Sequence, residues 1–229
     1  MAAPAHYTFK HSPYSSHFLL PAQLPPEGQG CRVLDLGCAD GYLGAMLAAR
    51  GYRVTGVERA GGVTADFPAS IELVTADLDA GLPPLDGVFD YILCADILEH
   101  LKDPLALLRQ MPQRLAPEGR LIASLPNSGN IYFRWQILLG RFPQHDKGLF
   151  DRTHLHFYPW DGWRDLLAAA EFRIESVRPT GIPVGLALPN LDGTLPVRAA
   201  ERVSYEVARA WMRLFAYQFI IVARWEGVR

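Results

Sequence analysis

The sequence predicts an α/β fold, in which a seven-stranded sheet, mostly parallel with an antiparallel final strand, carries helices on both faces. Up to residue 126, apolar runs typical of strands buried on both faces alternate with helical patterns. A Gly-rich turn, "GCADG" at 37–41, follows the first of these runs. Open parallel sheets bind their ligands at this position, so we expect the functional site there.

Five strands are expected in the first half, at 31–37, 52–58, 70–77, 88–96 and 118–127. Apolar residues at helical spacing predict a helix over 41–51, which Gly51 is suited to end. A second helix is expected over 103–115, where Pro112 should kink or shorten it.

The second half changes character. Residues 128–160 are rich in aromatic residues, His and Gly and show no clear periodicity, and a helix follows over 160–172. Two strands, 172–180 and 216–225, are expected to close the sheet as an antiparallel pair, separated by a Gly/Pro loop at 181–194 and a helix over 196–213.

The helix over 196–213 carries two kinds of residue. We expect an apolar stripe packed on the protein, formed by Val203, Val207, Ala210 and Leu214. Four arginines lie beside it, and we expect a solvated face paired with Glu201 and Glu206, formed by Arg198, Arg202, Arg209 and Arg213. Contact with an anionic substrate or a membrane surface is the alternative.

Composition excludes several classes of protein. The formal net charge of -2 gives no basic field for DNA or RNA, and three cysteines are too few for a disulfide framework. The first residues lack the pattern of a signal peptide, and the longest apolar stretch is too short to span a membrane. We therefore expect a cytoplasmic protein without a membrane span.

The turn at 37–41 departs from the dinucleotide-binding pattern G-x-G-x-x-G. Asp35 and Asp40 would repel a pyrophosphate at this place. A cationic ligand removes the conflict, and S-adenosylmethionine has a sulfonium, an α-ammonium and no phosphate. Acids at the turn therefore favour this cofactor.

The stretch "VLDLGCADG" resembles the first motif of the class I S-adenosylmethionine-dependent methyltransferases, usually written (V/I)LD(V/L)GCGxG. The resemblance implies a Rossmann-like methyltransferase sheet and a cofactor bound by Asp35, Gly37, Cys38, Ala39 and Gly41. Ala39 stands where glycine is usual, and it fits there if its φ is negative.

Further landmarks of this family follow at suitable distances, and the resemblance covers residues 31–126 closely. It implies that Glu58 binds both ribose hydroxyls and that Asp77, followed by Leu78, lies at the adenine amino group. The motif "FDYILCADILEHLKDP" resembles the one after strand four and adds Asp96 to the cofactor site.

Residues 124–160 resemble a narrower group of bacterial methyltransferases that are often linked with glycosyltransferases, with some likeness to MetW. We expect one methyltransferase domain over 1–229, made of a cap segment at 1–30, a cofactor-binding half at 31–126 and an acceptor-side half at 127–229 with a lid insertion. In the cap, Tyr14 and His17 are placed to cover the cofactor; the alternative is a surface helix.

The acceptor pocket is expected over strands four and five. Its wall could include the aromatic residues Tyr132, Phe133, Trp135, Phe142, Phe150, Phe157 and Tyr158, although simple packing of these residues is the alternative. An oxygen or nitrogen acceptor must lose a proton, so a base is expected. Candidates are His100, His145, His154, His156, Asp146 and Asp151. His100 and His154 are the predicted catalytic pair.

An alternative for "DRTHLHF" is structural: Asp151 and Arg152 could fix the segment by ion pairing, with His154 or His156 hydrogen-bonded in the core. The histidines and acids lack a compact metal-ligand pattern, so no metal is expected.

Methyl transfer to O or N of a small-molecule or glycan acceptor is the leading hypothesis, with S-adenosylhomocysteine as product. A regulatory protein of the MetW type is the alternative, and a homodimer or an enzyme partner stays open. A nucleic-acid substrate is not expected.

Overall fold

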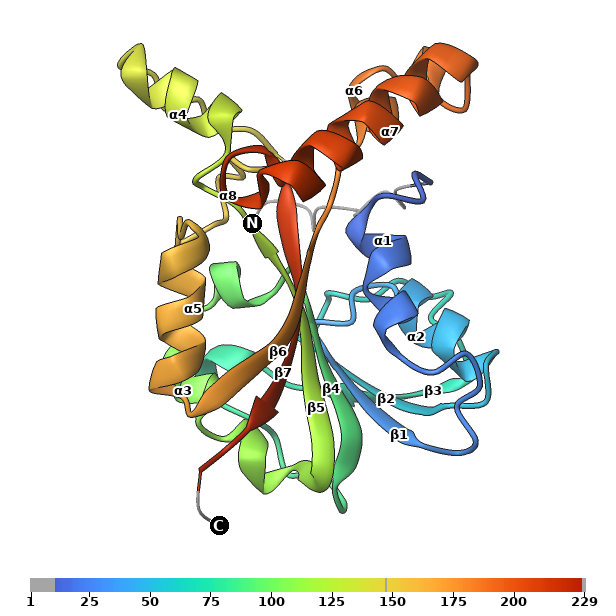
Figure 1. The fold of residues 1–229 in the computed structure, drawn as a ribbon. Helices are drawn as coiled ribbons and strands as arrows, with labels where there is room; N and C mark the ends of the chain where they lie inside the picture. The colour runs from blue at the N-terminus through green and yellow to red at the C-terminus, as the bar shows by residue number, and fades with distance from the viewer. Residues whose placement is uncertain (1–10, 147, 228–229) are drawn as a thin grey trace.

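A single seven-stranded sheet runs through the molecule (Figure 1). The computed structural model describes residues 11–146 and 148–227. The strands are β1 (Arg32–Leu36), β2 (Arg53–Glu58), β3 (Ile71–Thr75), β4 (Phe89–Ala95), β5 (Leu115–Pro126), β6 (Phe172–Pro179) and β7 (Gln218–Trp225). Their order is β3-β2-β1-β4-β5-β7-β6, and only β7 runs antiparallel to its neighbours. The fold class predicted from the sequence is confirmed.

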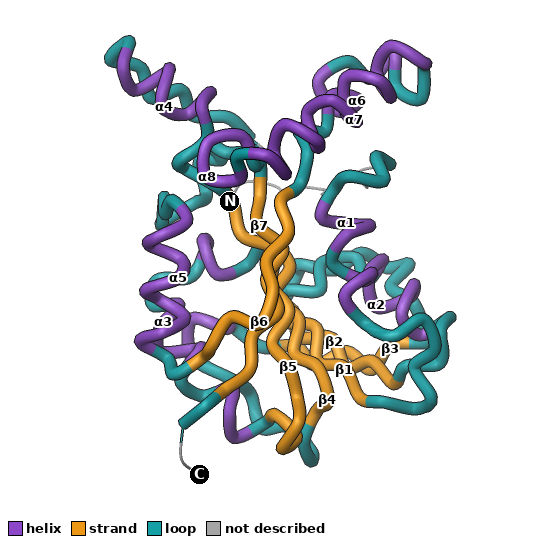
Figure 2. Tube along the Cα trace, in the orientation of Figure 1, coloured by secondary structure: helices purple, strands orange, loops and turns teal. Residues whose placement is uncertain are grey.

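Helices cover both faces of this sheet, as Figure 2 shows. One face carries α1 (Ser16–Leu19) and α2 (Tyr42–Ala48), and the other carries α3 (Pro104–Leu108) and α5 (Trp160–Ala169). The predicted helix over 103–115 is short because α3, capped by the Asp103 side chain, gives way to a 3-10 helix at Met111–Gln113 that contains Pro112. The effect expected of this proline is confirmed.

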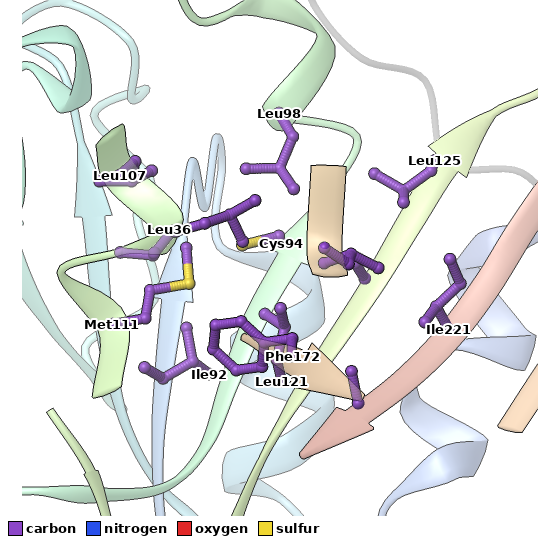
Figure 3. Close-up of a cluster of buried hydrophobic side chains, with 14 of the residues drawn as sticks. Leu36, Ile92, Cys94, Leu98, Leu107, Met111, Leu121, Leu125, Phe172 and Ile221 are labelled. Atoms are coloured by element: carbon purple, nitrogen blue, oxygen red, sulfur yellow. The ribbon is translucent and has the colours of Figure 1, made fainter. Parts of the chain in front are cut away.

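The larger core lies between the sheet and the α3/α5 layer (Figure 3). Leu36, Ile92 and Leu121 come from the adjacent strands β1, β4 and β5, and none of the three has exposed surface. They belong to the same cluster as Leu107 and Met111 of the covering layer. Central strands with both faces covered are apolar without alternation, which is why the sequence pattern marked them clearly.

The second half contains a helix that the sequence did not reveal. α4 (Ile131–Leu138) lies in the stretch without clear periodicity. Its side chains are mostly exposed, and Phe133 is the buried one. A helix that buries one residue leaves no periodic apolar stripe to detect. The predicted loop at 181–194 also contains two short helices, α6 (Val184–Ala187) and a 3-10 helix at Pro189–Leu191.

The apolar stripe predicted to pack on the protein is not the buried face of the late helix. α7 (Leu195–Ala210) buries Val197, Glu201 and Ala208, whereas Val203 is 62% exposed and Val207 is also exposed. α7 extends away from the sheet (Figure 1), and it packs with the face that carries Val197 and Ala208 and not with the predicted stripe. The expected arginine pairing is half right: Arg209 pairs with Glu206, but Glu201 is buried and accepts a hydrogen bond from the Gly185 backbone N–H.

Two buried asparagines fix the junction between β5 and these helices. The Asn127 and Asn130 side-chain amides both donate to the carbonyl oxygen of Ala216, over 2.9 and 2.8 Å. Ala216 directly follows α8 (Met212–Phe215). The Asn130 side chain also accepts from the Tyr132 backbone N–H and so caps α4. The "PNSGN" segment therefore anchors α4 and α8 at the carboxyl end of β5.

Candidate functional site

The turn after β1 takes a left-handed backbone at three positions. Gly37 and Gly41 both have φ of 72°, and Ala39 has φ of 46°. A Cβ on Gly37 would lie 2.8 Å from the Ile97 side chain, so this residue must be glycine for space as well as for its backbone. The condition of a negative φ at Ala39 is therefore not met, and the turn imposes a glycine-like backbone on this alanine.

Asp35 lies under this turn at the end of β1, and its side chain is buried. Neither carboxylate oxygen has a hydrogen-bond partner among the described residues. Burial raises the pKa of the Asp35 carboxyl to about 7, and the nearby Glu58 carboxylate adds to the rise. Such a carboxylate is costly in the protein alone, and a neighbouring cation would stabilise it.

Glu58, at the end of β2, is tied to the same turn. Its carboxylate accepts from the Ala39 backbone N–H over 2.9 Å and from the Arg59 backbone N–H over 3.0 Å. Cys38 is buried beside them and its backbone N–H donates to Val57. The turn residues named by the sequence and Glu58 are therefore brought together at adjacent strand ends.

Asp77 and Leu78 follow β3 at the rim of this region. Asp77 is exposed, and its carboxylate accepts from the Asp79 backbone N–H over 3.0 Å, which caps a 3-10 helix at Leu78–Ala80. Leu78 is buried in the core beneath. The side chain of Asp77 stays at the surface, where a ligand lying across the strand ends can reach it.

Asp96 follows β4 with φ of 55° and is fixed by two side chains. The Ser124 hydroxyl of β5 donates to its carboxylate, and the Gln218 side-chain amide of β7 donates to the same oxygen over 2.7 Å. Sequence reasoning missed Ser124 and Gln218. Gln218 had a detectable signal, since it is a polar residue within an apolar strand and is buried.

Two histidines from distant parts of the chain meet beside this aspartate. His100 ends a 3-10 helix at Leu98–His100 directly after β4, and its ring centroid lies 4.7 Å from that of His154. The contact forms because the Leu155 and His156 backbone N–H groups both donate to the Glu99 carbonyl oxygen. The structure thus brings together the two histidines that the sequence predicted as catalytic.

A hydrogen-bonded chain leads from His100 to a buried acid. The Thr153 hydroxyl donates to the Asp151 carboxylate over 2.6 Å and lies 3.0 Å from His100 Nδ1. Asp151 is buried and also accepts from the Thr153 backbone N–H. Sequence reasoning missed Thr153, because its role depends on a contact between residues 53 positions apart.

Both histidines are held neutral near pH 7. Burial lowers the pKa of His100 below its usual value, while the Asp151 carboxylate opposes this shift. Burial also lowers the pKa of His154 to about 4, and the adjacent His100 adds to the effect. A neutral imidazole keeps one nitrogen lone pair, so each ring can accept a proton or bind a metal ion.

Glu99, His100 and His154 also form a group that could hold a metal ion, with one ligand atom from each lying within 4.8 Å of the others. Sequence spacing could not find it, because His154 is distant in the chain. Around tetrahedral zinc, ligand atoms lie about 3.3 Å apart. The Glu99 Oε1 to His154 Nε2 distance of 4.0 Å is more open than that. We retain the prediction that no metal is required.

The other candidate bases are engaged elsewhere. His156 Nε2 lies 2.9 Å from the Leu101 carbonyl oxygen, so this histidine holds the segment to the end of β4. Asp146 is exposed and pairs with Arg152 over 2.9 Å. Of the ion pairing suggested for Asp151 and Arg152, Arg152 therefore forms its part, whereas Asp151 bonds to Thr153 instead. His145 forms a backbone bridge with Asp151.

The expected aromatic wall divides into two parts. A packed cluster stands next to the histidines and consists of Phe133, Phe142, Phe150 and Phe157, with the rings of Phe133 and Phe150 stacked at 4.2 Å. Tyr132 contacts this cluster at Phe150, Trp135 is exposed, and Tyr158 packs on Trp163 in the core.

The cap segment reaches the turn through α1. The His17 Nε2 atom lies 2.8 Å from the Tyr42 hydroxyl of α2, and both residues line a narrow cavity that also includes Asp96 and Ser124. Tyr14 instead stacks on Tyr205 of α7. The first ten residues of the predicted cap lie outside the described residues.

A family model for a methyltransferase domain matches residues 12–177. The chain belongs to this methyltransferase family. The methyltransferase is an S-adenosylmethionine-dependent enzyme of class I, as the sequence motif predicted. Its fold is shared with a chain of the complex between a methyltransferase and its activator from Haloferax volcanii, at a TM-score of 0.63 and 17% identity over 93% of this chain and 90% of that chain.

A second solved structure is a magnesium protoporphyrin IX methyltransferase from Synechocystis PCC 6803 with bound S-adenosylhomocysteine. It aligns with a TM-score of 0.58 and 19% identity over 92% of the methyltransferase and 80% of that chain. Among curated proteins, the ubiquinone biosynthesis O-methyltransferase of Xanthomonas euvesicatoria is 36% identical over 115 residues. That alignment covers 44% of this chain and 45% of the relative, so the methyltransferase matches less than half of the relative's length. No helix in the described part of the chain is long and apolar enough to cross a membrane.

Proposed function

We propose that this methyltransferase transfers the methyl group of S-adenosylmethionine to a hydroxyl oxygen of a small-molecule acceptor, with His100 as the general base. The observation that carries the proposal is the chain Asp151–Thr153–His100 beside Asp96. It holds a neutral imidazole at the end of β4, where the family motif places the methyl end of the cofactor. His154 packs against this ring and restricts its orientation.

The residues at the strand ends suit the cofactor. In the proposal, the Glu58 carboxylate holds the ribose diol, and Asp77 binds at the adenine edge. Backbone groups of the 37–41 turn contact the amino-acid end, and Asp35 stabilises its α-ammonium from below. Leu78 supports the adenine side and Asp96 the methyl end. The carboxylate of Asp35, which has no partner in the described residues, supports a cationic ligand here.

The hydrogen bonds of His100 define its tautomer. Its Nδ1 atom lies 3.3 Å from the Thr153 carbonyl oxygen, which can only accept, so Nδ1 carries the proton. The Thr153 hydroxyl uses its own proton for Asp151 and likewise accepts from Nδ1. The lone pair of His100 therefore lies on Nε2. This is the arrangement that a base requires.

The proposed step balances on named atoms. S-adenosylmethionine supplies the methyl group and leaves as S-adenosylhomocysteine when the sulfur–carbon bond breaks. The acceptor oxygen forms the new bond to carbon, and its proton passes to His100 Nε2. Asp151 stabilises the resulting imidazolium through Thr153, and the aromatic cluster next to the histidines keeps water away from the reacting atoms.

A phenol or catechol is the acceptor class that we favour. The curated relatives are O-methyltransferases of ubiquinone biosynthesis, which supports an oxygen acceptor on a small molecule. The partly exposed ring of Phe157 packs on His154 and suits a flat aromatic acceptor. A sugar or glycan hydroxyl, which the sequence also suggested, stays a prediction, and such acceptors can be tested beside the phenols.

The test is a pH profile of methyl transfer to phenols and catechols, measured as S-adenosylhomocysteine released. Activity should rise with pH through the pKa of His100, below its ordinary value, because only the neutral ring accepts a proton. His100→Ala should lower kcat by about 10²- to 10⁴-fold with little change in cofactor affinity.

Two variants of Thr153 test whether its hydroxyl supports His100 as the base. Thr153→Val should lower kcat and move the acid limb to lower pH, because the protonated ring loses the Thr153 hydroxyl that links its Nδ1 atom to Asp151. Thr153→Ser keeps the hydroxyl and should restore both kcat and the pH profile.

Activity should survive dialysis against EDTA. If EDTA abolished the activity and zinc restored it, a metal ion would take the role proposed for the base. If no acceptor in the panel were methylated, a regulatory protein would be favoured.

A further inference from the structure

Two helical arms project from the end of the molecule that carries the site (Figure 1). The α4 arm consists of residues 131–142, and the α7 arm of residues 184–213. The α4 arm follows the carboxyl end of β5, and the α7 arm lies between the carboxyl end of β6 and the amino end of β7. The arms diverge, so their far ends are outermost points of the molecule (Figure 2). Most residues of both arms are exposed and do not pack on the sheet.

The far ends of both arms are apolar and exposed. On the α4 arm, Leu138 is 75% exposed, and Leu139 is also exposed. On the α7 arm, Leu195 is 81% exposed, with Leu188 and Leu191 exposed beside it. Isolated exposed leucines are ordinary, but clusters at two projecting ends indicate a contact surface.

The arms are also basic, whereas the remainder of the chain is acidic. Residues 131–142 hold two arginines and no acid, and residues 184–213 hold four arginines against three acids, so the arms carry net +3 and the remainder of the chain net -5. Arg141, Arg198 and Arg202 are exposed, and none pairs with an acidic side chain among the described residues. Apolar tips with basic flanks suit the headgroup region of an anionic bilayer.

We propose that the two arms dock the enzyme on the surface of an anionic phospholipid bilayer, with the leucine tips inserted at the headgroup boundary. A second copy of the chain fits less well, because arm-to-arm contact would bring like charges together. The separate tips also do not form the continuous patch that a protein interface uses. In this orientation the carboxyl end of the sheet, with His100 and the cofactor turn, faces the lipid.

The experiment is co-sedimentation of the full chain with vesicles of phosphatidylcholine alone or with one quarter phosphatidylglycerol. We expect binding to the anionic vesicles, little binding to phosphatidylcholine, and release at 0.5 M NaCl. Leu138→Glu with Leu195→Glu should weaken binding by about tenfold or more, because the tips lose their apolar contact. Arg198→Gln with Arg202→Gln should weaken it by about fivefold per arginine.

The matched control is Val88→Glu, which places a glutamate on an exposed apolar residue next to the amino end of β4, away from the arms. It should leave vesicle binding unchanged. Equal loss in this variant, or no binding of the wild type to anionic vesicles, would overturn the proposal. A dimer in light scattering that the Leu138/Leu195 variant dissociates, without vesicle binding, would show an interface between copies instead. These readouts do not depend on catalysis.

Discussion

At the scale of single residues, Ala39 carries a cost that its position in the turn imposes. A left-handed backbone costs an alanine about 1 kcal/mol or more, and glycine avoids this cost. Ala39→Gly should therefore keep the stability or raise it by up to about 1 kcal/mol, after the larger chain entropy of glycine is counted. Urea denaturation measures this.

The matched control for this variant is Ala45→Gly, which makes the same substitution inside α2. A helical glycine should cost about 1 kcal/mol there. If Ala39→Gly lost as much stability as Ala45→Gly, the left-handed turn at Ala39 would be wrong.

Asp35 gives a prediction on cofactor binding. With a pKa of about 7, its carboxyl is about half protonated at neutral pH. A bound α-ammonium favours the ionised form, so binding of S-adenosylhomocysteine should release a proton and tighten by about tenfold between pH 6 and pH 8. Titration calorimetry in buffers of different ionisation enthalpy measures both effects.

Asp35→Asn separates this effect from titration of the ligand itself. The asparagine cannot ionise, so the variant should bind more weakly at pH 8 and show the smaller pH dependence that belongs to the ligand. Glu58→Ala should weaken binding at every pH and, because the Glu58 carboxylate raises the pKa of Asp35, move the proton release to lower pH. An unchanged pH dependence in Asp35→Asn would contradict the role proposed for Asp35.

Among the elements, the junction after β5 depends on Asn130. Its side chain caps α4 and binds the Ala216 carbonyl oxygen, and it is buried. Asn130→Ala should lower the free energy of unfolding by about 1–3 kcal/mol, because a cap is lost and a buried carbonyl loses a donor. Asn190→Ala, at an exposed position, should change it by no more than about 0.5 kcal/mol. Equal effects of the two would exclude the anchoring role.

The elements also show what the sequence could predict. The sequence predicted strands β1, β2 and β4 because they are mostly apolar and show little alternation, as strands covered on both faces do. α4 was missed because it buries Phe133 alone. The helix α7 was predicted correctly, but its apolar stripe was wrongly predicted to pack in the core. A periodic apolar pattern shows which face of a helix is suited to burial, but it does not show whether another element covers that face.

For the whole molecule, sequence motifs located the cofactor side of the site better than the acceptor side. Asp35, the turn and Glu58 lie within 24 positions of each other, in a pattern set by one strand–turn–helix–strand unit. The acceptor side joins His100 to Thr153 and His154, and Asp96 to Gln218, over 53 or more positions. These pairings depend on the order of the sheet and on side-chain contacts that local patterns do not encode.

The place of β7 has a consequence for biosynthesis. This strand comes last along the described chain, yet it lies between β5 and β6. Until the ribosome has made residue 225, β5 has an open edge of unpaired backbone groups, and Asp96 lacks its partner Gln218. A nascent chain stalled after β6 would expose that edge to pairing with other chains. Assembly of the reacting end of the site is thereby delayed until β7 has been made.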